Sequence, residues 1–439
     1  MTNSHLKTKK LSGWGNFPSK FCNFQKPHNA ESFLVKKTDS LIARGQGRSY
    51  GDSSFSSELT LGTQNLTFLK SFDEEKGIVT SESGLTVDKL LPVIVPKGWF
   101  LPASPGTKFV SIGGMVASDV HGKNHHKEGS FGNHVIELKI LLSNDEILIC
   151  NNDLNSDLFW ATIGGMGLTG IILEVTFKLK KITSYKMKQD TLRANNLKEA
   201  MSIFEKVDDQ TYSVAWIDCL ASGKSLGRSL IFRAEHFDEE FNKIKYFSKK
   251  LFDLPVFLPR FFLNRFFVKS FNFLYFLFNT VFKKKIVDSD SYFYPLDKIL
   301  NWNKLYGKKG FMQYQCFIPK KNSYVALNEI LRVVSKSKSA SFLAVLKLFG
   351  PKNSGIMSFP DEGYTLAMDF QNRKETFDLL NILDEIVIKN NGRLYLSKDS
   401  RLSSKNFRSM NYDLSSFIKI REKYKSHKFC SEQSRRLEI

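Results

Sequence analysis

The chain has 439 residues, of which 42% are hydrophobic and 25% charged, as is ordinary for a globular protein with a large core. Lysine and arginine outnumber aspartate and glutamate by 64 to 44, and the net charge of +20 indicates an acidic partner such as a phosphorylated substrate or an anionic membrane surface. Because the basic residues are spread along the chain without an arginine-rich arm, we expect no nucleic acid among the partners.

The cysteines indicate a reducing environment. They form no CxxC pair, so we expect mostly buried thiols, no metal site and no disulfide framework. The first residues, "MTNSHLKTKKLSGWG", lack the apolar stretch of a signal peptide, which favours a cytoplasmic location. The five cysteines are Cys22, Cys150, Cys219, Cys316 and Cys430.

The stretch "ARGQGRSYGDSS", residues 43–54, contains three glycines and two arginines and predicts a loop. Glycines let the backbone approach a ligand closely. Free backbone N–H groups beside Arg44 and Arg48 indicate an anion, and a diphosphate is the first candidate.

The elements that follow predict an α+β first domain over residues 1–183. A helix is expected to begin near Thr86, a hairpin to turn at residues 143–145, and a strand to end near Lys181. Residues 184–391 contain longer helical runs and apolar strands, which predict a second domain with a sheet covered by helices. Residues 392–439 return to compact, basic, motif-like sequence.

The segment "GGMGLTG" contains Gly165-x-Gly167-x-x-Gly170, which matches the dinucleotide-binding fingerprint. That fingerprint requires a strand before it and a helix after it. Here a helix-like run precedes and a strand-like run follows, so a Rossmann domain is not expected.

Four histidines fall between residues 121 and 134. No cysteine or acidic ligand pattern accompanies them, so we expect no metal site. They form either a polar surface loop or a polar wall that faces a ligand, with His121 and Lys123 as hydrogen-bond donors.

Several long motifs carry a resemblance. "IARGQGRSYGD", "GTKFVSIGGMVASDVHGKNHHKEGSFGNHV" and "LFWATIGGMGLTGII" resemble the flavin domain of vanillyl-alcohol-oxidase-type (PCMH) flavoproteins. Within that superfamily, "YPLDKILNWNKLYGKKGFMQYQCFIP", "FLAVLKLFGPKNSGIMSFP" and "GRLYLSKDSR" are similar to the decaprenylphosphoryl-β-D-ribose 2-oxidase family. The resemblance covers nearly the whole chain.

The resemblance implies a two-domain α+β flavoprotein whose FAD domain is completed by the C-terminal segment and whose substrate domain has an antiparallel sheet covered by helices. It implies oxidation of the ribose 2-hydroxyl of a polyprenyl phosphate sugar to a ketone. A separate NAD(P)H-dependent short-chain reductase would then complete the epimerisation to the arabinose donor for cell-envelope polysaccharide. Two alternatives stay open: an aldonolactone or alditol oxidase of the same superfamily, and a flavin-free protein that binds lipid phosphates.

The same resemblance implies the FAD contacts. FAD is expected to be held without a covalent bond, because Arg48 stands where many relatives have the histidine that links to the flavin. For Ile172 and Tyr395 the resemblance is the sole argument. The implied contacts are Ala43, Arg44, Gly45, Gln46, Gly47, Arg48, Ser49, Tyr50, Gly51, Asp52, Ser53, Gly106, Ser111, Ile112, Gly113, Gly114, Ser118, Asp119, Val120, His121, Ile172 and Tyr395.

Alcohol oxidation needs a base for the hydroxyl proton and positive charge near the reduced flavin. Lys398 is predicted to supply the charge, whereas His121, Tyr50 and Lys398 all stay candidates for the base. Gln313 and Gln315 alternate along a strand, so both are expected to face one ligand. The resemblance places Tyr294, Gln313 and Gln315 at family positions that line the sugar pocket. The residues predicted to bind the substrate are therefore Lys123, Tyr294, Gln313, Gln315, Lys347 and Lys398.

Residues 251–285 form a Phe-rich insertion. Arg265 and Lys269 interrupt its apolar run, so a membrane-spanning helix is not expected. A helix over about 261–283 would gather its polar residues on one narrow face, with phenylalanines around the rest. It is either a core helix with a solvated polar stripe or a helix that lies on the inner face of the cell membrane beside a lipid-tailed substrate.

Overall fold

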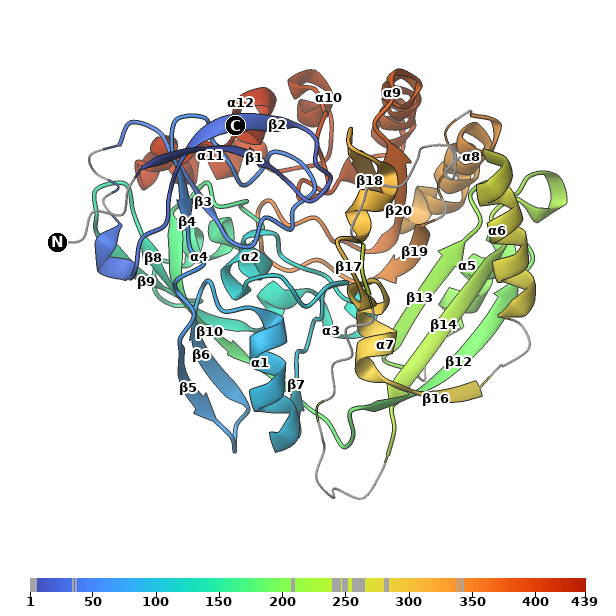
Figure 1. Ribbon diagram of the computed structural model, residues 1–439, viewed down its shortest axis with the longest axis horizontal. Coiled ribbons are helices and arrows are strands. Elements are labelled where there is room, and N and C mark those ends of the chain that lie inside the picture. Colours follow the sequence, from blue (N-terminus) through green and yellow to red (C-terminus); the bar gives the residue numbers. More distant parts are fainter. Residues whose placement is uncertain are drawn as a thin grey trace.

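The computed structural model has the predicted α+β architecture. Figure 1 shows two groups of sheets, with the N-terminal strands on one side, a large sheet on the other, and the C-terminal helices in the upper part of the view. The residues it describes are 6–33, 35, 38–206, 210–238, 246, 252–254, 265–279, 284–337, 339, 341 and 343–439.

Two main sheets and a short antiparallel pair, β7 with β11, form the first part of the chain. In the smaller sheet, β3 pairs in parallel with β4 and leads directly into the glycine-rich loop. The larger sheet is antiparallel in the order β5-β6-β10-β8-β9. The strands of this part are β1 (Lys7–Ser12), β2 (Ser19–Gln25), β3 (Ile42–Arg44), β4 (Thr60–Gly62), β5 (Leu69–Asp73), β6 (Ile78–Glu82), β7 (Trp99–Phe100), β8 (Val135–Leu141), β9 (Ile147–Cys150), β10 (Ile171–Lys178) and β11 (Lys180–Lys181).

The local predictions for this part are confirmed. A helix begins after Thr86, β8 and β9 form the expected hairpin, and the GxGxxG segment lies after a helix and before β10. Val87, Leu90, Leu91 and Ile94 of the first helix are buried in a core shared with β8 and β10. The helices are α1 (Val87–Ile94), α2 (Ile112–Ala117), α3 (His125–Glu128) and α4 (Ser156–Thr162).

A second, eight-stranded sheet is antiparallel throughout, in the order β16-β12-β14-β13-β19-β20-β18-β21. It begins shortly after the expected domain boundary at residue 183, and the boundary itself stays a prediction. The strands are β12 (Lys186–Ala194), β13 (Tyr212–Ile217), β14 (Ser229–His236), β16 (Lys284–Asp288), β18 (Phe311–Pro319), β19 (Ala344–Phe349), β20 (Gly363–Gln371) and β21 (Arg393–Leu394). A separate parallel pair joins β15 (Phe252–Asp253) and β17 (Ile299–Leu300).

The two faces of this sheet differ. Tyr314, Cys316, Leu366 and Met368 alternate with more polar positions and pack in one core against α5 (Leu197–Glu205), α8 (Ser323–Lys336) and α9 (Lys374–Lys389). The strand register places Gln315, Ala367, Val345 and Trp216 in one row on the opposite face. The polar side chains of β18 and β20 therefore face away from these helices.

The C-terminal segment packs against the first part of the chain. Cys430 N donates to Leu41 O at 2.8 Å, and the Arg436 guanidinium lies 2.6 Å from Asp52 Oδ1 and 2.9 Å from Asp399 Oδ2. This segment therefore completes the surroundings of the glycine loop. Its helices are α10 (Ser404–Arg408), α11 (Leu414–Lys423) and α12 (Glu432–Leu437).

The Phe-rich segment contains the helix α6 (Arg265–Phe278), and the rest of the predicted helix lies outside the described residues. The polar residues of this helix do not share one environment: Lys269 is exposed, as a solvated stripe requires, whereas Asn272 is buried. Asn272 is 1% exposed and donates to Asp218 Oδ1 at 2.8 Å, between the buried Val268 and Phe276. Asn272 therefore faces the sheet, where Asp218 offers it an acceptor, and most of the phenylalanines of α6 face outward.

Two observations complete the fold. Among the described helices, none is long and apolar enough to cross a bilayer. The five cysteines are unpaired and four are buried, which confirms the expectation of mostly buried thiols.

Candidate active site

The glycine-rich loop begins where β3 ends. The Arg44 guanidinium is held within the protein: it donates to Ser12 O of β1 at 2.7 Å and to Ser54 Oγ at 3.0 Å. Any contact between Arg44 and a ligand would therefore come from its backbone. The Arg48 guanidinium lies over the Trp14 ring, 4.2 Å from its centroid.

This loop has the features of an anion cradle. Among the described residues, no backbone carbonyl accepts a hydrogen bond from the N–H groups of residues 45–49. Gly47 has a φ of +63°, and a Cβ on Gly45 would come within 2.3 Å of Ser111 Oγ. Consecutive free N–H groups in such a turn bind phosphate oxygens. The close packing explains why glycine stands at both positions.

Buried polar atoms without partners lie in the neighbouring segments. Within the described chain, Ser53 Oγ, Ser83 Oγ, Gln64 Oε1 and Arg48 Nε make no hydrogen bond. A buried polar atom without a partner is costly, so these atoms indicate a polar ligand. A Cβ on Gly106 would meet nothing within 4 Å, which leaves open space at the second loop. The donor set and the space fit the diphosphate and polar edges of FAD.

The side chains of two other predicted FAD contacts, Asp119 and Asp52, bind other groups of the protein. The Asp119 carboxylate accepts from Gly132 N at 2.9 Å, Ser130 Oγ at 2.8 Å and Asn353 Nδ2 at 2.9 Å. The Asp52 carboxylate is paired with Arg436. Both side chains therefore hold loops in place, and binding at these positions would fall to the backbone.

His121 lies in an aromatic cage. Its ring contacts those of Phe349, Phe359 and Tyr395, and the Tyr395 hydroxyl donates to Ser118 O at 2.8 Å. Burial, Lys347 and His125 lower the pKa of His121 well below its usual value, so the imidazole is neutral. His121 and Tyr395, which were both predicted to contact FAD from distant parts of the chain, thus meet here. Ile172 is buried in the core beside β8.

The predicted catalytic and sugar-binding residues largely converge. Gln315 Nε2 is 2.9 Å from His121 Nε2, and Lys398 Nζ lies over the Tyr50 ring, 3.9 Å from its centroid. Gln313 donates to Asp369 Oδ1 at 2.6 Å from the same side of β18. The prediction that both glutamines share one face is confirmed.

Three partly buried lysines concentrate positive charge at this place. Burial lowers the pKa of Lys398 and Lys123 to about 7, and that of Lys347 to about 8. The charge of Lys347 contributes to the lowered pKa of both Lys123 and Lys398. Together, Lys123, Lys347 and Lys398 form what we call the lysine cluster, which suits an anionic group.

Tyr294 stands apart from this arrangement. Its hydroxyl forms a 2.5 Å hydrogen bond with Ser104 Oγ, and the side chain is 1% exposed. The Lys123 ammonium donates to Tyr292 O and lies over the Tyr292 ring. The Tyr294 hydroxyl therefore already has a hydrogen-bond partner within the protein. The charge of Lys347, in contrast, contributes to the lowered pKa of Lys123.

Sequence reasoning missed Asp369. This carboxyl is fully buried, accepts from Tyr306 at 3.2 Å as well as from Gln313, and lies near Lys398. Burial raises its pKa to about 7. The signal was available: Thr365 and Asp369 alternate with Leu366 and Met368 in an otherwise apolar strand, which places two polar side chains on one face.

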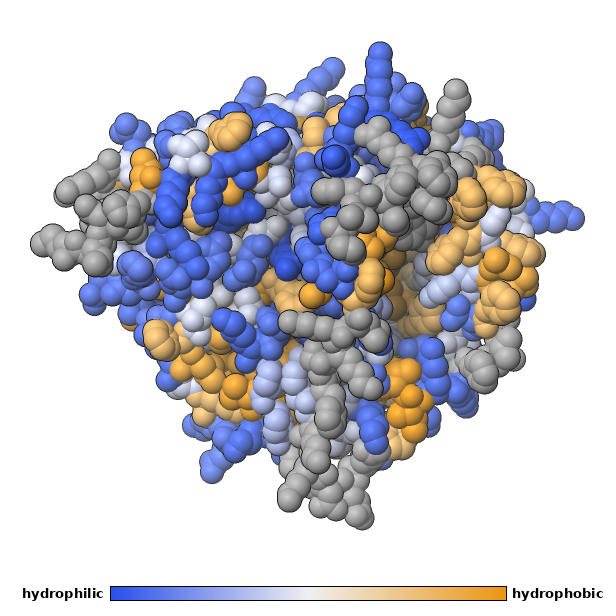
Figure 2. Space-filling view, viewed as in Figure 1, coloured by the Kyte–Doolittle hydropathy of each residue, from blue (hydrophilic) through white to orange (hydrophobic). Residues whose placement is uncertain are grey.

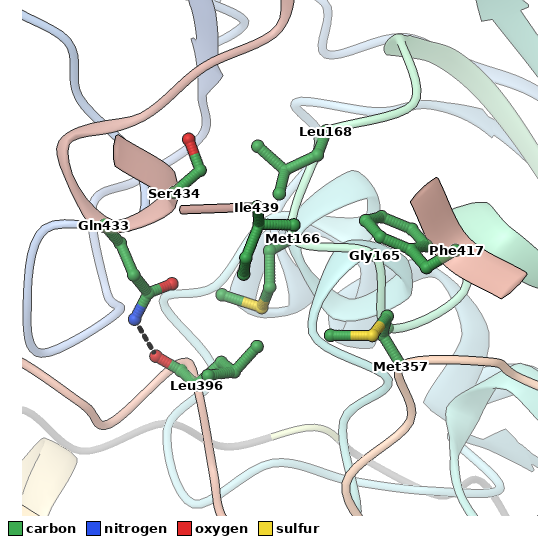
Figure 3. A pocket seen from close by; sticks show the side chains of 10 residues that line it. Gly165, Met166, Leu168, Met357, Leu396, Phe417, Gln433, Ser434 and Ile439 are labelled. Atoms are coloured by element: carbon green, nitrogen blue, oxygen red, sulfur yellow. Dashed lines mark hydrogen bonds between the residues drawn. The ribbon is translucent and has the colours of Figure 1, made fainter. Parts of the chain in front are cut away.

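A small apolar pocket lies elsewhere, between the loop at Gly164–Leu168 and the C-terminal segment (Figure 3). Met166, Met357 and Ile439 point into it, while Gln433 donates to Leu396 O at 2.7 Å at its edge. It shares no residue with the lysine cluster. We interpret it as a packing gap where the C-terminal segment meets the first part of the chain.

The comparisons agree with this site. The FAD binding domain family matches residues 31–151, which contain the first two glycine loops and His121. The loops, the free N–H groups and this match define an FAD-dependent oxidoreductase.

Curated relatives narrow the class. The chain is 32% identical to decaprenylphosphoryl-beta-D-ribose oxidase of Mycolicibacterium smegmatis, over 98% of each chain. It therefore belongs to the decaprenylphosphoryl-β-D-ribose oxidase family. The chain is also 34% identical to a putative D-arabinono-1,4-lactone oxidase of Neurospora crassa, in an alignment that covers 30% of this chain and 24% of that protein. Bovine L-gulonolactone oxidase is 28% identical over 36% of this chain and 35% of its own.

Proposed function

We propose that this protein oxidises the 2-hydroxyl of a polyprenylphosphoryl-β-D-ribose to the 2-keto sugar. The observation that carries the proposal is the lysine cluster beside the face of β18 that presents Gln313 and Gln315. A sugar phosphate needs both positive charge and amide or hydroxyl partners. A neutral lactone needs no such charge, and the lactone oxidases align with only about a third of the chain.

Of the three candidates for the base, Lys398 is favoured. With a pKa of about 7 it is partly neutral at neutral pH and can take the hydroxyl proton. Burial keeps Tyr50 protonated, because it raises the pKa of the phenol well above its usual value. FAD, when bound, supplies the acceptor for the hydride. Lys398 becomes a cation once it holds the proton, which also supplies the expected positive charge near the flavin.

Anaerobic flavin reduction tests this function. The loss of flavin absorbance is followed after mixing the purified protein with polyprenylphosphoryl ribose, with ribose 5-phosphate or with L-gulonolactone. Rapid bleaching by the lipid-linked sugar alone supports the proposal. Bleaching by the lactone and not by the phosphorylated sugar contradicts it and favours the lactone oxidase alternative.

We propose further that the protein binds the inner face of the cell membrane through α6. The outward side of this helix is apolar, and Figure 2 shows hydrophobic side chains gathered where Figure 1 places α6. Lys269, Lys284 and Lys285 are exposed on or near it. We call the apolar side the α6 patch; it consists of Phe266, Phe267, Phe271, Phe273, Leu274, Leu277 and Phe278.

The position of α6 suits a lipid-linked substrate. Tyr275 of α6 packs on Trp216, with ring centroids 4.9 Å apart, and Trp216 lies in the same sheet row as Val345 and Gln315. The α6 patch and the sugar site thus belong to one face of the eight-stranded sheet. A polyprenyl tail could stay in the bilayer while its phosphate meets Lys347.

The fate of the product follows from its chemistry. A 2-keto sugar becomes an arabinose only by reduction from the opposite side, and this reduction needs a hydride donor. We propose that a separate NAD(P)H-dependent short-chain reductase acts on it. Adding such a reductase with NADPH should convert the accumulated keto sugar into the arabinose epimer, which chromatography of the released sugar detects.

A further inference from the structure

A chain of hydrogen bonds behind His121 determines where its proton lies. The chain begins at Thr365, whose hydroxyl donates to Cys316 O at 2.9 Å. A carbonyl oxygen can only accept, so the single hydroxyl proton of Thr365 is committed. Any further hydrogen bond to Thr365 Oγ1 must come from a donor.

That donor is the Gln315 amide. Its Nε2 lies 3.2 Å from Thr365 Oγ1 and 2.9 Å from His121 Nε2. Because Thr365 accepts, the amide nitrogen and not the amide oxygen must face it. The second N–H of the same group then points to His121 Nε2, which must carry no proton.

His121 is a neutral imidazole, since it is 7% exposed, caged by Phe349, Phe359 and Tyr395, and surrounded by the positive charges of Lys347 and Lys398. A neutral imidazole with a bare Nε2 carries its proton on Nδ1. In the described residues His121 Nδ1 is buried and has no hydrogen-bond partner.

We propose that Thr365 and Gln315 hold His121 as an Nδ1–H donor that serves an acceptor atom of the bound cofactor or sugar. Gln315 and Thr365 are then positioning residues. His121 donates a hydrogen bond to the ligand and does not act as the base that removes a proton. This goes beyond the proposed function, and it holds whichever alcohol is oxidised.

Nitrogen-15 NMR of the holoenzyme with labelled histidine tests the proposal. The chain has eight histidines, and the His121 signals are assigned from their loss in His121→Gln. We expect a protonated Nδ1 and a bare Nε2. A protonated Nε2 in the wild type would overturn the proposal.

Variants test the positioning role. In Thr365→Val the Gln315 amide loses one acceptor, so we expect a mixture of His121 tautomers and about tenfold slower flavin reduction. Thr365→Ser should restore the single tautomer and the wild-type rate. In Gln315→Glu a carboxylate faces Nε2, so the proton should appear there. A single Nδ1–H tautomer in Thr365→Val contradicts the proposal, and this result stands even if Gln315→Glu fails to fold.

Two additions distinguish whether the atom that accepts from His121 Nδ1–H belongs to the cofactor or to the sugar. A shift of the Nδ1–H proton signal on dithionite reduction of the flavin indicates a cofactor atom. A shift on adding the phosphorylated sugar to the oxidised enzyme indicates a sugar atom. If neither addition moves the signal, Nδ1–H serves no ligand and the proposed donor role is wrong.

Discussion

At the scale of single residues, Lys398 combines a lowered pKa with a position over an aromatic ring. It is a cation-forming group with a pKa of about 7, and it lies directly over the Tyr50 ring. Asp369 opposes the lowering of its pKa, whereas burial and Lys347 cause it. The protein thus keeps one lysine able to exchange a proton at neutral pH.

Replacing this lysine gives the first prediction. Lys398→Ala should slow flavin reduction about 100-fold or more, because it removes both the proton acceptor and the charge that it becomes. Stopped-flow absorbance measures the rate, and flavin content and melting temperature show that the fold is kept. Lys405→Ala, which removes an exposed lysine, is the control and should reduce at the wild-type rate. Near wild-type reduction in Lys398→Ala would exclude Lys398 from the reaction.

The lysine cluster also predicts how phosphate binding depends on pH. A bound anion stabilises the ammonium forms of Lys123 and Lys347, so above their lowered pKa values binding must take up protons. By linkage, affinity should fall as pH rises from about 7 to about 9. Calorimetry with an isoprenyl phosphodiester measures this, because the charge of the ligand stays constant over that range. An affinity that does not change with pH contradicts the assignment.

At the scale of elements, α6 shows how one buried polar side chain can fix which side of a helix faces a sheet. Asn272 meets Asp218, Phe276 lies beneath Arg193 and Arg228, and Val268 joins the core. The sheet thus supplies a partner for Asn272, and the phenylalanines other than Phe276 are left outside. Periodicity located the polar and apolar faces but not which of them the sheet would accept.

The α6 patch predicts binding to anionic bilayers. Phe266 and Phe278 are 76% and 68% exposed, so their burial in the interface is favourable, and nearby lysines add about 1 kcal/mol each at an anionic surface. The wild type should sediment with anionic liposomes, and the variant Phe266→Ser, Phe273→Ser, Phe278→Ser should not.

The control for this experiment changes exposed phenylalanines far from α6. Phe21→Ser with Phe68→Ser removes two such rings from the first part of the chain and should leave sedimentation unchanged. If the α6 variant still sediments like the wild type, or if neither binds at low salt, the membrane proposal fails.

At the scale of the whole molecule, three distant parts of the chain surround one place. Tyr50 N donates to Ser397 O at 2.9 Å, and a Cβ on Gly51 would lie 1.9 Å from Asp399 O. The β18 face meets His121 on the other side. The first loop, the sheet and the C-terminal segment must therefore all be folded before the site exists.

The surroundings of Arg48 predict that FAD is held without a covalent bond. FAD should be released when the protein unfolds, because Arg48, packed on Trp14 and Phe109, offers no covalent link. Acid precipitation should leave the yellow colour in the supernatant, where absorbance measures it. Flavin that stays in the pellet after washing contradicts the prediction.

The sequence by itself determined the glycine-rich loops and the family. Glycine spacing, the helix start at Thr86 and the hairpin at residues 143–145 depend on neighbours in the chain, and local backbone conformation is enough to specify them. The motifs that carry the resemblance are equally local. The alternation of Gln313 and Gln315 also predicted their shared face.

Only the tertiary structure decided which partner each polar group takes. Gln315 meets His121 across 194 residues, Asn272 meets Asp218 across 54, and Arg436 meets Asp52 across 384. A buried polar group must find a partner, and several were chemically possible in each case. Which one is within reach depends on how the sheets and the C-terminal segment pack. This packing placed Gln315 against His121 and left most phenylalanines of α6 exposed.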